Sequence, residues 1–311
     1  IVGCGALGCS HAETLARAGV GFLRIVDRDF VEFSNLQRQT LFSEKDSKEK
    51  LPKAVAAKDR LYKINSEIEV ASIVADVNYS NIESLMKDCD LVLDGMDNFQ
   101  TRYLINDACV KSGKPWIYGA AVSSYGATMT IIPNETPCLR CIFEEMPGAG
   151  TSPTCDTAGV IQPIISTVSA VQTTEALKIL TGNVVKLHRS LMQFDVWQND
   201  WRKIKLGKPN TDCKTCGQRN FEFLNAENTE FSAVLCGRHA VQISPPNPVQ
   251  IDLENLAEKL ENSGEVKQNE HLLRLTVGEY ELTIFRDARA IISGTDDIST
   301  ARSIYAKFVG V

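Results

Sequence analysis

Long apolar runs and blocks of basic residues are both missing from this sequence of 311 residues. No apolar run reaches the roughly 18 residues that a membrane-spanning helix needs, so a transmembrane protein is not expected. The formal net charge is −6 and the lysines and arginines form no cluster, so a positively charged patch for nucleic acid or for an anionic membrane surface is not expected either. The sequence therefore predicts no nucleic-acid partner and no membrane partner.

Histidines and paired cysteines are also few. The four histidines form no motif, and each is expected to be a surface or packing residue rather than a base. Only four of the ten cysteines occur in C-x-x-C pairs, Cys138 with Cys141 and Cys213 with Cys216. A secreted disulfide framework would be shorter and denser in cysteine, so we expect a reducing, cytoplasmic environment.

No signal peptide opens the sequence. The chain begins with Ile1, inside what reads as the end of a strand. We therefore expect further residues to precede it in the complete protein, and targeting is left open.

Strand-like and helix-like segments alternate from residue 1 to about residue 122. This alternation is typical of a parallel sheet with helices on both faces, so we expect a Rossmann-like, doubly wound α/β fold. From Ser123 the pattern becomes that of antiparallel strands. A crossover loop rich in glycine and proline follows, and then an apolar helix at 164–180.

The composition shifts again after Cys216. Residues 243–248 (ISPPNP) read as a linker or turn, followed by two helices and three short strands without a catalytic motif. We expect a larger domain at residues 1–224 and a small α+β domain at residues 225–311.

The glycine loop GCGALG contributes Gly3, Gly5 and Gly8 between a strand and a helix. Such a loop allows close backbone approach, and the helix N-terminus offers N–H groups to a phosphate. Asp27 ends the next strand, where a carboxylate can bind the ribose of a nucleotide. The pattern indicates a nucleotide site; the alternative is a purely structural tight turn.

The residues after this loop distinguish between nucleotides. SNLQRQ supplies Asn35 and Arg38, and LPKAVAA places Lys53 at the start of a helix. A nicotinamide enzyme has no evident need for two cations beside the pyrophosphate, whereas cleavage of ATP between its α and β phosphates is favoured by them. The alternative is that Arg38 and Lys53 are ordinary solvated surface residues.

Acidic residues follow a further buried strand in LDGMDN, namely Asp94 and Asp97, with Asn98 next in the chain. Ligands bind at the carboxyl edge of a parallel sheet, and an aspartate there can hold Mg²⁺ that bridges phosphate oxygens. For Asp97 the alternative is a helix cap, which does not exclude metal binding.

The two C-x-x-C pairs are separated by 71 residues. Two such pairs are typical of a closed, tetrahedral Cys₄ zinc site with a structural role. Redox dithiols are the alternative, but one pair would then be expected beside a thioredoxin-like βαβ unit.

Several motifs occur together in order: GCGALG, VDRDFVEFSNLQRQTLF, LPKAVAA, GMDN, CLRC, TCDTAGV, QTTEALKILTG and CKTC. With them the chain resembles the ThiF/MoeB/HesA family, bacterial relatives of ubiquitin-activating enzymes, over residues 1–224. TCDTAG and the additional C-terminal unit are most similar to the ThiF-type proteins of Gram-positive bacteria.

The resemblance implies an activity. Members of this family use ATP and Mg²⁺ to adenylate the C-terminal Gly-Gly carboxylate of a ubiquitin-like sulfur carrier, releasing pyrophosphate. A sulfur donor then produces a thiocarboxylate. Thiamine biosynthesis with a ThiS-like carrier is favoured, and molybdopterin biosynthesis with a MoaD-like carrier is the alternative.

The resemblance also implies roles for individual residues. Gly3, Gly5 and Gly8 would form the nucleotide loop, and Asp27 would bind the ribose. Asn35, Arg38 and Lys53 would contact the phosphates, Asp97 would bind Mg²⁺, and Cys155 would bond to the carrier during sulfur transfer or be a spectator thiol.

Family members are homodimers, and the apolar helix at 164–180 could contribute to the interface. They also have a preceding segment whose arginine reaches the ATP of the other subunit, and that segment is absent from this sequence. No rhodanese-like active loop is found, so any persulfide is expected from a separate protein such as a cysteine desulfurase.

Two other functional classes, an oxidoreductase and a non-catalytic docking protein, would each explain part of the sequence. A nicotinamide-dependent oxidoreductase would explain the glycine loop and Asp27, but would leave Lys53 and the cysteine pairs unused, and no Tyr-x-x-x-Lys motif is present. A non-catalytic platform that docks a carrier would not need Arg38, Lys53 and Asp97.

Overall fold

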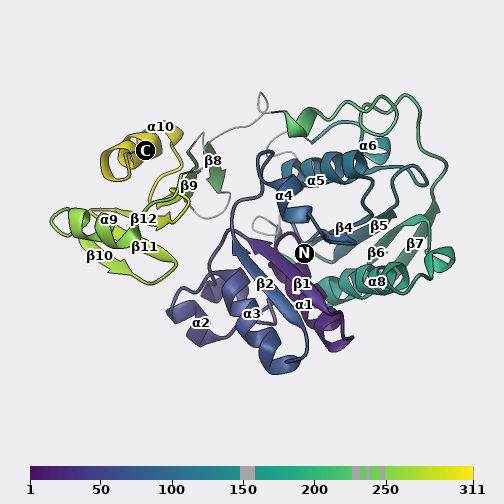
Figure 1. Ribbon diagram of the computed structural model, residues 1–311, viewed down its shortest axis with the longest axis horizontal. Coiled ribbons are helices and arrows are strands. Elements are labelled where there is room, and N and C mark those ends of the chain that lie inside the picture. Colours follow the sequence, from purple (N-terminus) through teal and green to yellow (C-terminus); the bar gives the residue numbers. More distant parts are fainter. Residues whose placement is uncertain (148–157, 226–231, 236–238, 246–248, 311) are drawn as a thin grey trace. The chain divides into compact units, whose positions relative to one another are not determined.

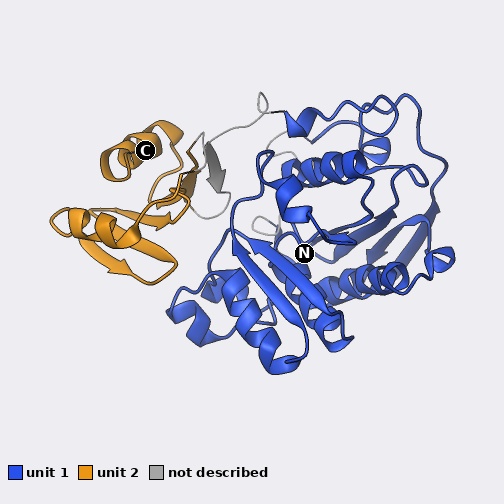
Figure 2. Ribbon diagram, in the orientation of Figure 1, with its two compact units in different colours: residues 1–228 blue, residues 229–311 orange. Residues whose placement is uncertain are grey.

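The computed structural model describes residues 1–147, 158–225, 232–235, 239–245 and 249–310 (Figure 1). The chain forms two compact units, Ile1–Asn228 and Thr229–Val311 (Figure 2). The first unit contains a two-stranded and a five-stranded sheet, which bridges at Val2 join, and the second contains a six-stranded sheet; each unit has its own hydrophobic core. The glycine loop and the cysteine pairs lie in the first unit.

Parallel strands form the first half of the larger unit. Strand β1 (Phe22–Asp27) pairs in parallel with β2 (Glu69–Val74), and β3 (Val92–Leu93) pairs in parallel with β4 (Trp116–Val122). Val2 forms parallel bridges to both Val26 and Asp94, so the start of the chain lies between β1 and β3. The chain therefore runs outward to β1 and β2 on one side of Val2 and later to β3 and β4 on the other.

Antiparallel strands complete this sheet. Strand β5 (Tyr125–Ile131) pairs with β4 and with β6 (Ser190–Asp195), and β6 pairs with the last strand, β7 (Asp200–Lys205). The change of pattern after Ser123 thus corresponds to a change from parallel to antiparallel pairing. The prediction of an α/β fold with an antiparallel extension is confirmed at this level.

Both faces of the sheet are covered at β4. Trp116 and Tyr118 belong to one hydrophobic core and Ile117 to another, as expected when successive side chains of a strand point to opposite faces. The first core includes α5 (Phe99–Ser112), and the second includes α1 (Ala6–Arg17) and α3 (Lys53–Ile64) (Figure 1). The shorter helices of this unit are α2 (Glu44–Lys48), α4 (Ile82–Met86) and α6 (Leu139–Ile142).

The apolar helix expected at 164–180 is α8 (Gln162–Leu180). It packs against α1 and against strands β4, β5 and β6. Its residues Ile164 and Val168 are fully buried in a core that also contains Phe194. This apolar face is thus used within the unit, and the homodimer with a contribution from this helix stays a prediction.

The smaller unit contains a six-stranded antiparallel sheet in the order β10, β11, β12, β13, β9, β8. The three predicted strands are β11 (Leu272–Val277), β12 (Tyr280–Phe285) and β13 (Ala290–Ser293), and the two predicted helices are α9 (Leu253–Leu260) and α10 (Ile298–Phe308). Three strands were not predicted: β8 (Ser232–Leu235), β9 (Ala240–Ile243) and β10 (Glu265–Gln268). The turn expected at 243–248 begins where β9 ends, so it lies inside this unit.

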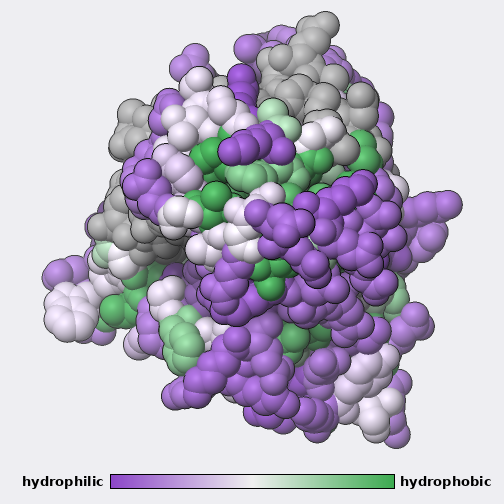
Figure 3. All heavy atoms as spheres, turned by 90° about the vertical axis from the view of Figure 1, so that its left-hand side faces the viewer, coloured by the Kyte–Doolittle hydropathy of each residue, from purple (hydrophilic) through white to green (hydrophobic). Residues whose placement is uncertain are grey.

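Hydrophilic side chains dominate the face of the molecule drawn in Figure 3, with hydrophobic ones between them in smaller groups. Across the described ranges, we find no helix that has both the length and the apolar character of a membrane span.

Candidate functional site

Three glycines bring two loops into backbone contact. Gly3 has φ +87°, which favours glycine, and its N–H donates to Val26 O at 2.8 Å. A Cβ atom on Gly8 would lie 2.0 Å from Gly3 O, and one on Gly95 would lie 2.5 Å from the same oxygen. The turn after β3 can therefore pack directly on the glycine loop. Gly95 was not singled out from the sequence, although it lies within the GMDN motif.

Gly5 has a different environment. A Cβ atom there would have its nearest neighbours, Gln39 Nε2 and Gly95 O, at 3.9 Å. Gly5 is the N-cap of α1 and has no side chain with which to cap the helix, and the first turn of the helix contains no acidic residue. The first N–H groups of a 12-residue helix are thus left for a ligand, and the helix dipole favours an anion.

Asp27 ends β1 as predicted and holds the glycine loop. Its two oxygens accept hydrogen bonds from Cys4 N at 2.6 Å and from Asp29 N at 2.7 Å. Burial raises the pKa of the Asp27 carboxyl above its usual value, and the nearby Lys53 ammonium opposes this rise. Because each carboxylate oxygen can accept two hydrogen bonds, Asp27 retains capacity for a ligand hydroxyl.

Lys53 begins α3, also as predicted, but it is not a solvated surface residue. It is only 4% exposed, and its Nζ forms an ion pair with Asp29 Oδ2 at 3.2 Å. Its backbone N–H donates to Asp29 O at 2.9 Å. The structure therefore places Lys53 beside the two acidic residues at the end of β1.

The SNLQRQ segment forms a 3₁₀ helix (Phe33–Asn35) and the turn that follows. Asn35 is 3% exposed and Gln39 is 4% exposed, and the side-chain oxygen of each has no hydrogen-bond partner in the described part of the chain. Arg38 is partly exposed and donates from Nη1 to Ser34 O at 3.0 Å. Gln39 was not identified from the sequence, and its amide is the side chain nearest to the open space at Gly5.

The cap of α5 is Asn98, whose side chain accepts from Thr101 N at 2.8 Å. The capping alternative for Asp97 is therefore wrong. Asp97 is exposed, so its carboxylate can be reached from solvent. Asn98 therefore has a structural role, and Asp97 is an acid that solvent can reach.

Asp94 is fully buried and shapes the turn that presents Asp97. It accepts from Met96 N at 2.8 Å and from Arg102 Nε at 3.0 Å. Burial raises the pKa of the Asp94 carboxyl, and the positive charge of Arg102 opposes this rise. Arg102, which was not identified from the sequence, also donates to Met96 O and Gly119 O, so this buried pair fixes the turn.

A buried histidine connects the glycine-loop helix to α8. Gln172 donates from Nε2 to Asp94 O at 3.2 Å and to Ile117 O at 3.1 Å, so its Oε1 faces His11 Nε2 at 2.8 Å. His11 must then carry its proton on Nε2, and its Nδ1 has no partner among the described residues. As predicted, His11 is a packing residue. Burial lowers its pKa to about 3.

We expect this histidine to make the protein sensitive to acid. The pKa of His11 is about 3 in the folded state and about 6.5 when unfolded. Between these values only the unfolded chain binds the proton, so the free energy of unfolding falls by about 1.4 kcal/mol for each pH unit below 6.5. His11→Gln retains an N–H donor at similar reach and should remove this contribution, as measured by urea unfolding at pH 7.5 and pH 5. Equal pH dependence in His11→Gln and in the wild type would contradict the expectation.

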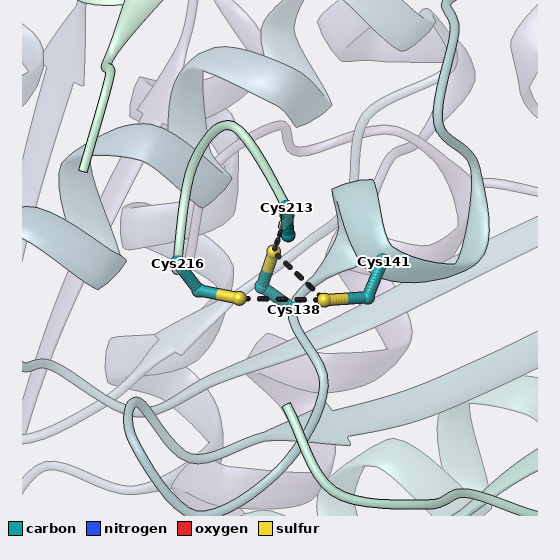
Figure 4. Close-up of side chains that lie close together, drawn as sticks. All are labelled: Cys138, Cys141, Cys213 and Cys216. Atoms are coloured by element: carbon teal, nitrogen blue, oxygen red, sulfur yellow. Dashed lines mark hydrogen bonds between the residues drawn. The ribbon is translucent and has the colours of Figure 1, made fainter. Parts of the chain in front are cut away.

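All four paired cysteines meet in one cluster, in which every sulfur lies within 4.8 Å of the others (Figure 4). The closest Sγ–Sγ distances are 3.3 Å for Cys141 with Cys216, 3.6 Å for Cys138 with Cys213, and 3.9 Å for Cys138 with Cys141. A zinc ion bound tetrahedrally by four sulfurs at about 2.3 Å would set them about 3.8 Å apart. The donor set and spacing therefore fit such an ion, and all four sulfurs are too far apart for a disulfide.

Cys155 lies outside the described residues, and its role stays a prediction.

Comparison with known proteins agrees with this architecture. The family model described as "ThiF family" matches residues 1–215. The chain is 46% identical to the "Sulfur carrier protein ThiS adenylyltransferase" of Bacillus subtilis, with 100% of this chain and 92% of that protein covered. It is 38% identical to the "SAMP-activating enzyme E1" of Haloferax volcanii over 70% of this chain and 79% of that protein.

A solved structure of Escherichia coli MccB with ATP has a similar fold, with a TM-score of 0.59 and 23% identity over 70% of this chain and 65% of that one. The family match covers the glycine loop and the GMDN turn of the candidate nucleotide site, and three of the four clustered cysteines. The chain therefore belongs to the ThiF family.

Proposed function

We propose that this protein uses ATP to adenylate the C-terminal carboxylate of a ThiS-like sulfur carrier protein. The single observation that carries the proposal is the 46% identity to a ThiS adenylyltransferase, because it extends over 100% of this chain and thus includes the second unit. The uncapped helix N-terminus at Gly5 supports an anionic ligand such as a triphosphate.

The charges around the site support one orientation of ATP. The Asp27 carboxylate at the end of β1 can accept further hydrogen bonds, and Lys53 and Arg28 are both paired with Asp29, so this end suits ribose hydroxyls better than phosphates. The phosphates would then lie over Gly5 and the N-terminus of α1, within reach of Asn35 and Arg38. The positive charge of Lys53 would also attract them. Asp97 would bind Mg²⁺, which would neutralise charge on the β and γ phosphates.

The reaction needs no general base. A C-terminal carboxylate is ionised at neutral pH and can attack the α-phosphorus directly, forming the acyl-adenylate while the bond to pyrophosphate breaks. Catalysis would consist of aligning these two groups and stabilising the charge on the departing pyrophosphate. Arg38 and Lys53 are the residues we assign to that stabilisation.

The cysteine cluster would hold a structural zinc ion. Four thiolates complete a tetrahedral shell and leave no open position for a substrate. The ion would link the segment at Cys138 to the segment at Cys213, and no step of the reaction involves it.

The test is ATP–pyrophosphate exchange with purified carriers that end in Gly-Gly, followed by intact-mass analysis of the carrier. A ThiS-like carrier should support exchange and gain the mass of AMP, and a MoaD-like carrier serves as the alternative substrate. A carrier lacking its last glycine is the control and should support no exchange. Exchange that does not depend on a carrier, or no exchange with either carrier, would contradict the proposal.

The later steps are assigned to other proteins. Conversion of the acyl-adenylate to a thiocarboxylate would need sulfur from a separate donor such as a cysteine desulfurase. Because the family is expected to act as a homodimer, the assay should be accompanied by a measurement of molar mass in solution.

A further inference from the structure

One face of helix α5 forms hydrogen bonds to the two chain segments that carry the cysteine pairs. Tyr103, Asn106 and Asp107 are spaced three and four residues apart, so their side chains project from the same side of the helix. Asn106 and Asp107 are completely buried, although both are polar. Buried polar side chains are costly unless they form hydrogen bonds, so their partners indicate why they are there.

Asn106 and Tyr103 form hydrogen bonds to the backbone beside the first cysteine pair. Asn106 Oδ1 accepts from Leu139 N at 2.9 Å, and Leu139 directly follows Cys138. The Tyr103 hydroxyl donates to Phe143 O at 2.6 Å, two residues after Cys141. The segment that carries the first two thiols is thus held at both of its ends.

Asp107 binds the second pair. Its Oδ1 accepts from the Thr215 hydroxyl at 2.8 Å, and Thr215 directly precedes Cys216. Its Oδ2 accepts from Phe223 N at 2.9 Å, which anchors the chain after the cysteines. Adjacent residues of one helix therefore hold two cysteine pairs that are 71 residues apart in the sequence.

An ion-pair bridge connects the two pairs on the outer side. Glu222 Oε2 lies 2.7 Å from Arg140 Nη1, and Glu222 Oε1 lies 3.5 Å from Lys214 Nζ. Arg140 lies between the first two cysteines and Lys214 between the second two. The segments are therefore joined to each other as well as to α5.

We propose that Asn106, Asp107 and Thr215 are positioning residues that assemble the four thiols before the metal binds. The inference rests on the metal site proposed above. A site that is already assembled binds its metal more tightly, because the ion does not have to order two separate loops. Removing one of these hydrogen bonds should therefore weaken metal binding more than it weakens the fold.

The test compares two substitutions at one position. Thr215→Val removes the hydroxyl that donates to Asp107, and Thr215→Ser retains it. Zinc affinity of the full chain is measured by competition with a chromophoric chelator under reducing conditions. Thr215→Val should weaken zinc binding by about tenfold or more, and Thr215→Ser should stay close to wild type.

Two further measurements separate positioning from a general loss of stability. The absorption spectrum of the Co²⁺ form reports whether four thiolates still surround the metal, and it should change in Thr215→Val. The thermal transition of the metal-free protein reports the fold, and it should shift less than that of the zinc-loaded protein. Lys111→Ala alters the exposed ion pair of α5 with Glu83 and should leave zinc affinity unchanged.

The proposal is wrong if Thr215→Val binds zinc as tightly as Thr215→Ser does, or if it lowers both thermal transitions equally without changing the affinity. If Thr215→Val does not fold, Asp107→Asn provides the same comparison, because it weakens the acceptor for Thr215 while preserving the shape of the side chain. None of these measurements uses adenylation, so their failure can be distinguished from a failure of the proposed function.

Discussion

Asp97→Ala is expected to lower carrier-dependent ATP–pyrophosphate exchange by about 10²–10³-fold, the range found when a group that stabilises transition-state charge is removed. Asp97 is exposed and does not cap α5, so its loss should not unfold the protein. The effect should appear mainly in the rate at saturating ATP, because the nucleotide would still be held by the glycine loop. Exchange rates over a range of ATP and Mg²⁺ concentrations provide the measurement.

Asp90→Ala is the matched control, because Asp90 is also an exposed aspartate but precedes β3, at the opposite end of the strand from Asp97. It should leave exchange unchanged. The variant Asp97→Glu retains a carboxylate, so raising the Mg²⁺ concentration should restore part of its activity. A wild-type rate of exchange in Asp97→Ala would mean that Asp97 takes no part in the reaction.

The second large effect distinguishes Gly8 from Gly5. Gly8→Ala would place a Cβ atom 2.0 Å from Gly3 O, so backbone must move and we expect a loss of about 3 kcal/mol in stability. Gly5→Ala meets nothing closer than 3.9 Å and should fold with nearly the wild-type stability. It should instead weaken ATP binding at least about tenfold, because its methyl group occupies the space assigned to the phosphates.

Urea unfolding and isothermal titration with ATP measure the two quantities separately. The variants serve as controls for each other, because each adds one methyl group to the same loop. A Gly5→Ala protein that binds ATP normally would mean that the phosphates lie elsewhere. A Gly8→Ala protein of wild-type stability would mean that the loop adopts another backbone arrangement.

The sequence was most informative where function depends on local spacing. The end of β1 at Asp27 and the start of α3 at Lys53 follow from an apolar run and from a proline before a helix, and both lie where they were expected. The meeting of the two cysteine pairs was also predictable, because C-x-x-C spacing reflects the geometry of a metal rather than of the fold. These patterns do not depend on residues that are distant in the sequence.

Residues whose importance comes from tertiary contacts were not predictable in this way. Arg102 matters because it meets Asp94 under the turn, and Gln172 matters because it joins His11 to two backbone carbonyls. Gln39 has no periodicity that would mark it, and only its burial beside Gly5 does so. In the smaller unit, β10 has the sequence EVKQ, in which Val266 is the one apolar residue, so it shows no alternating pattern.

Strand β7 has a consequence for solubility. It is the outermost strand of its sheet, and in the described part of the chain no further strand pairs with its free edge. Trp201 and Ile204 are exposed on it, which would favour edge-to-edge aggregation, but Lys203 and Lys205 are exposed there as well. Pairing two copies of this strand edge to edge would bring like charges together, so its lysines oppose the growth of a fibril from the open edge.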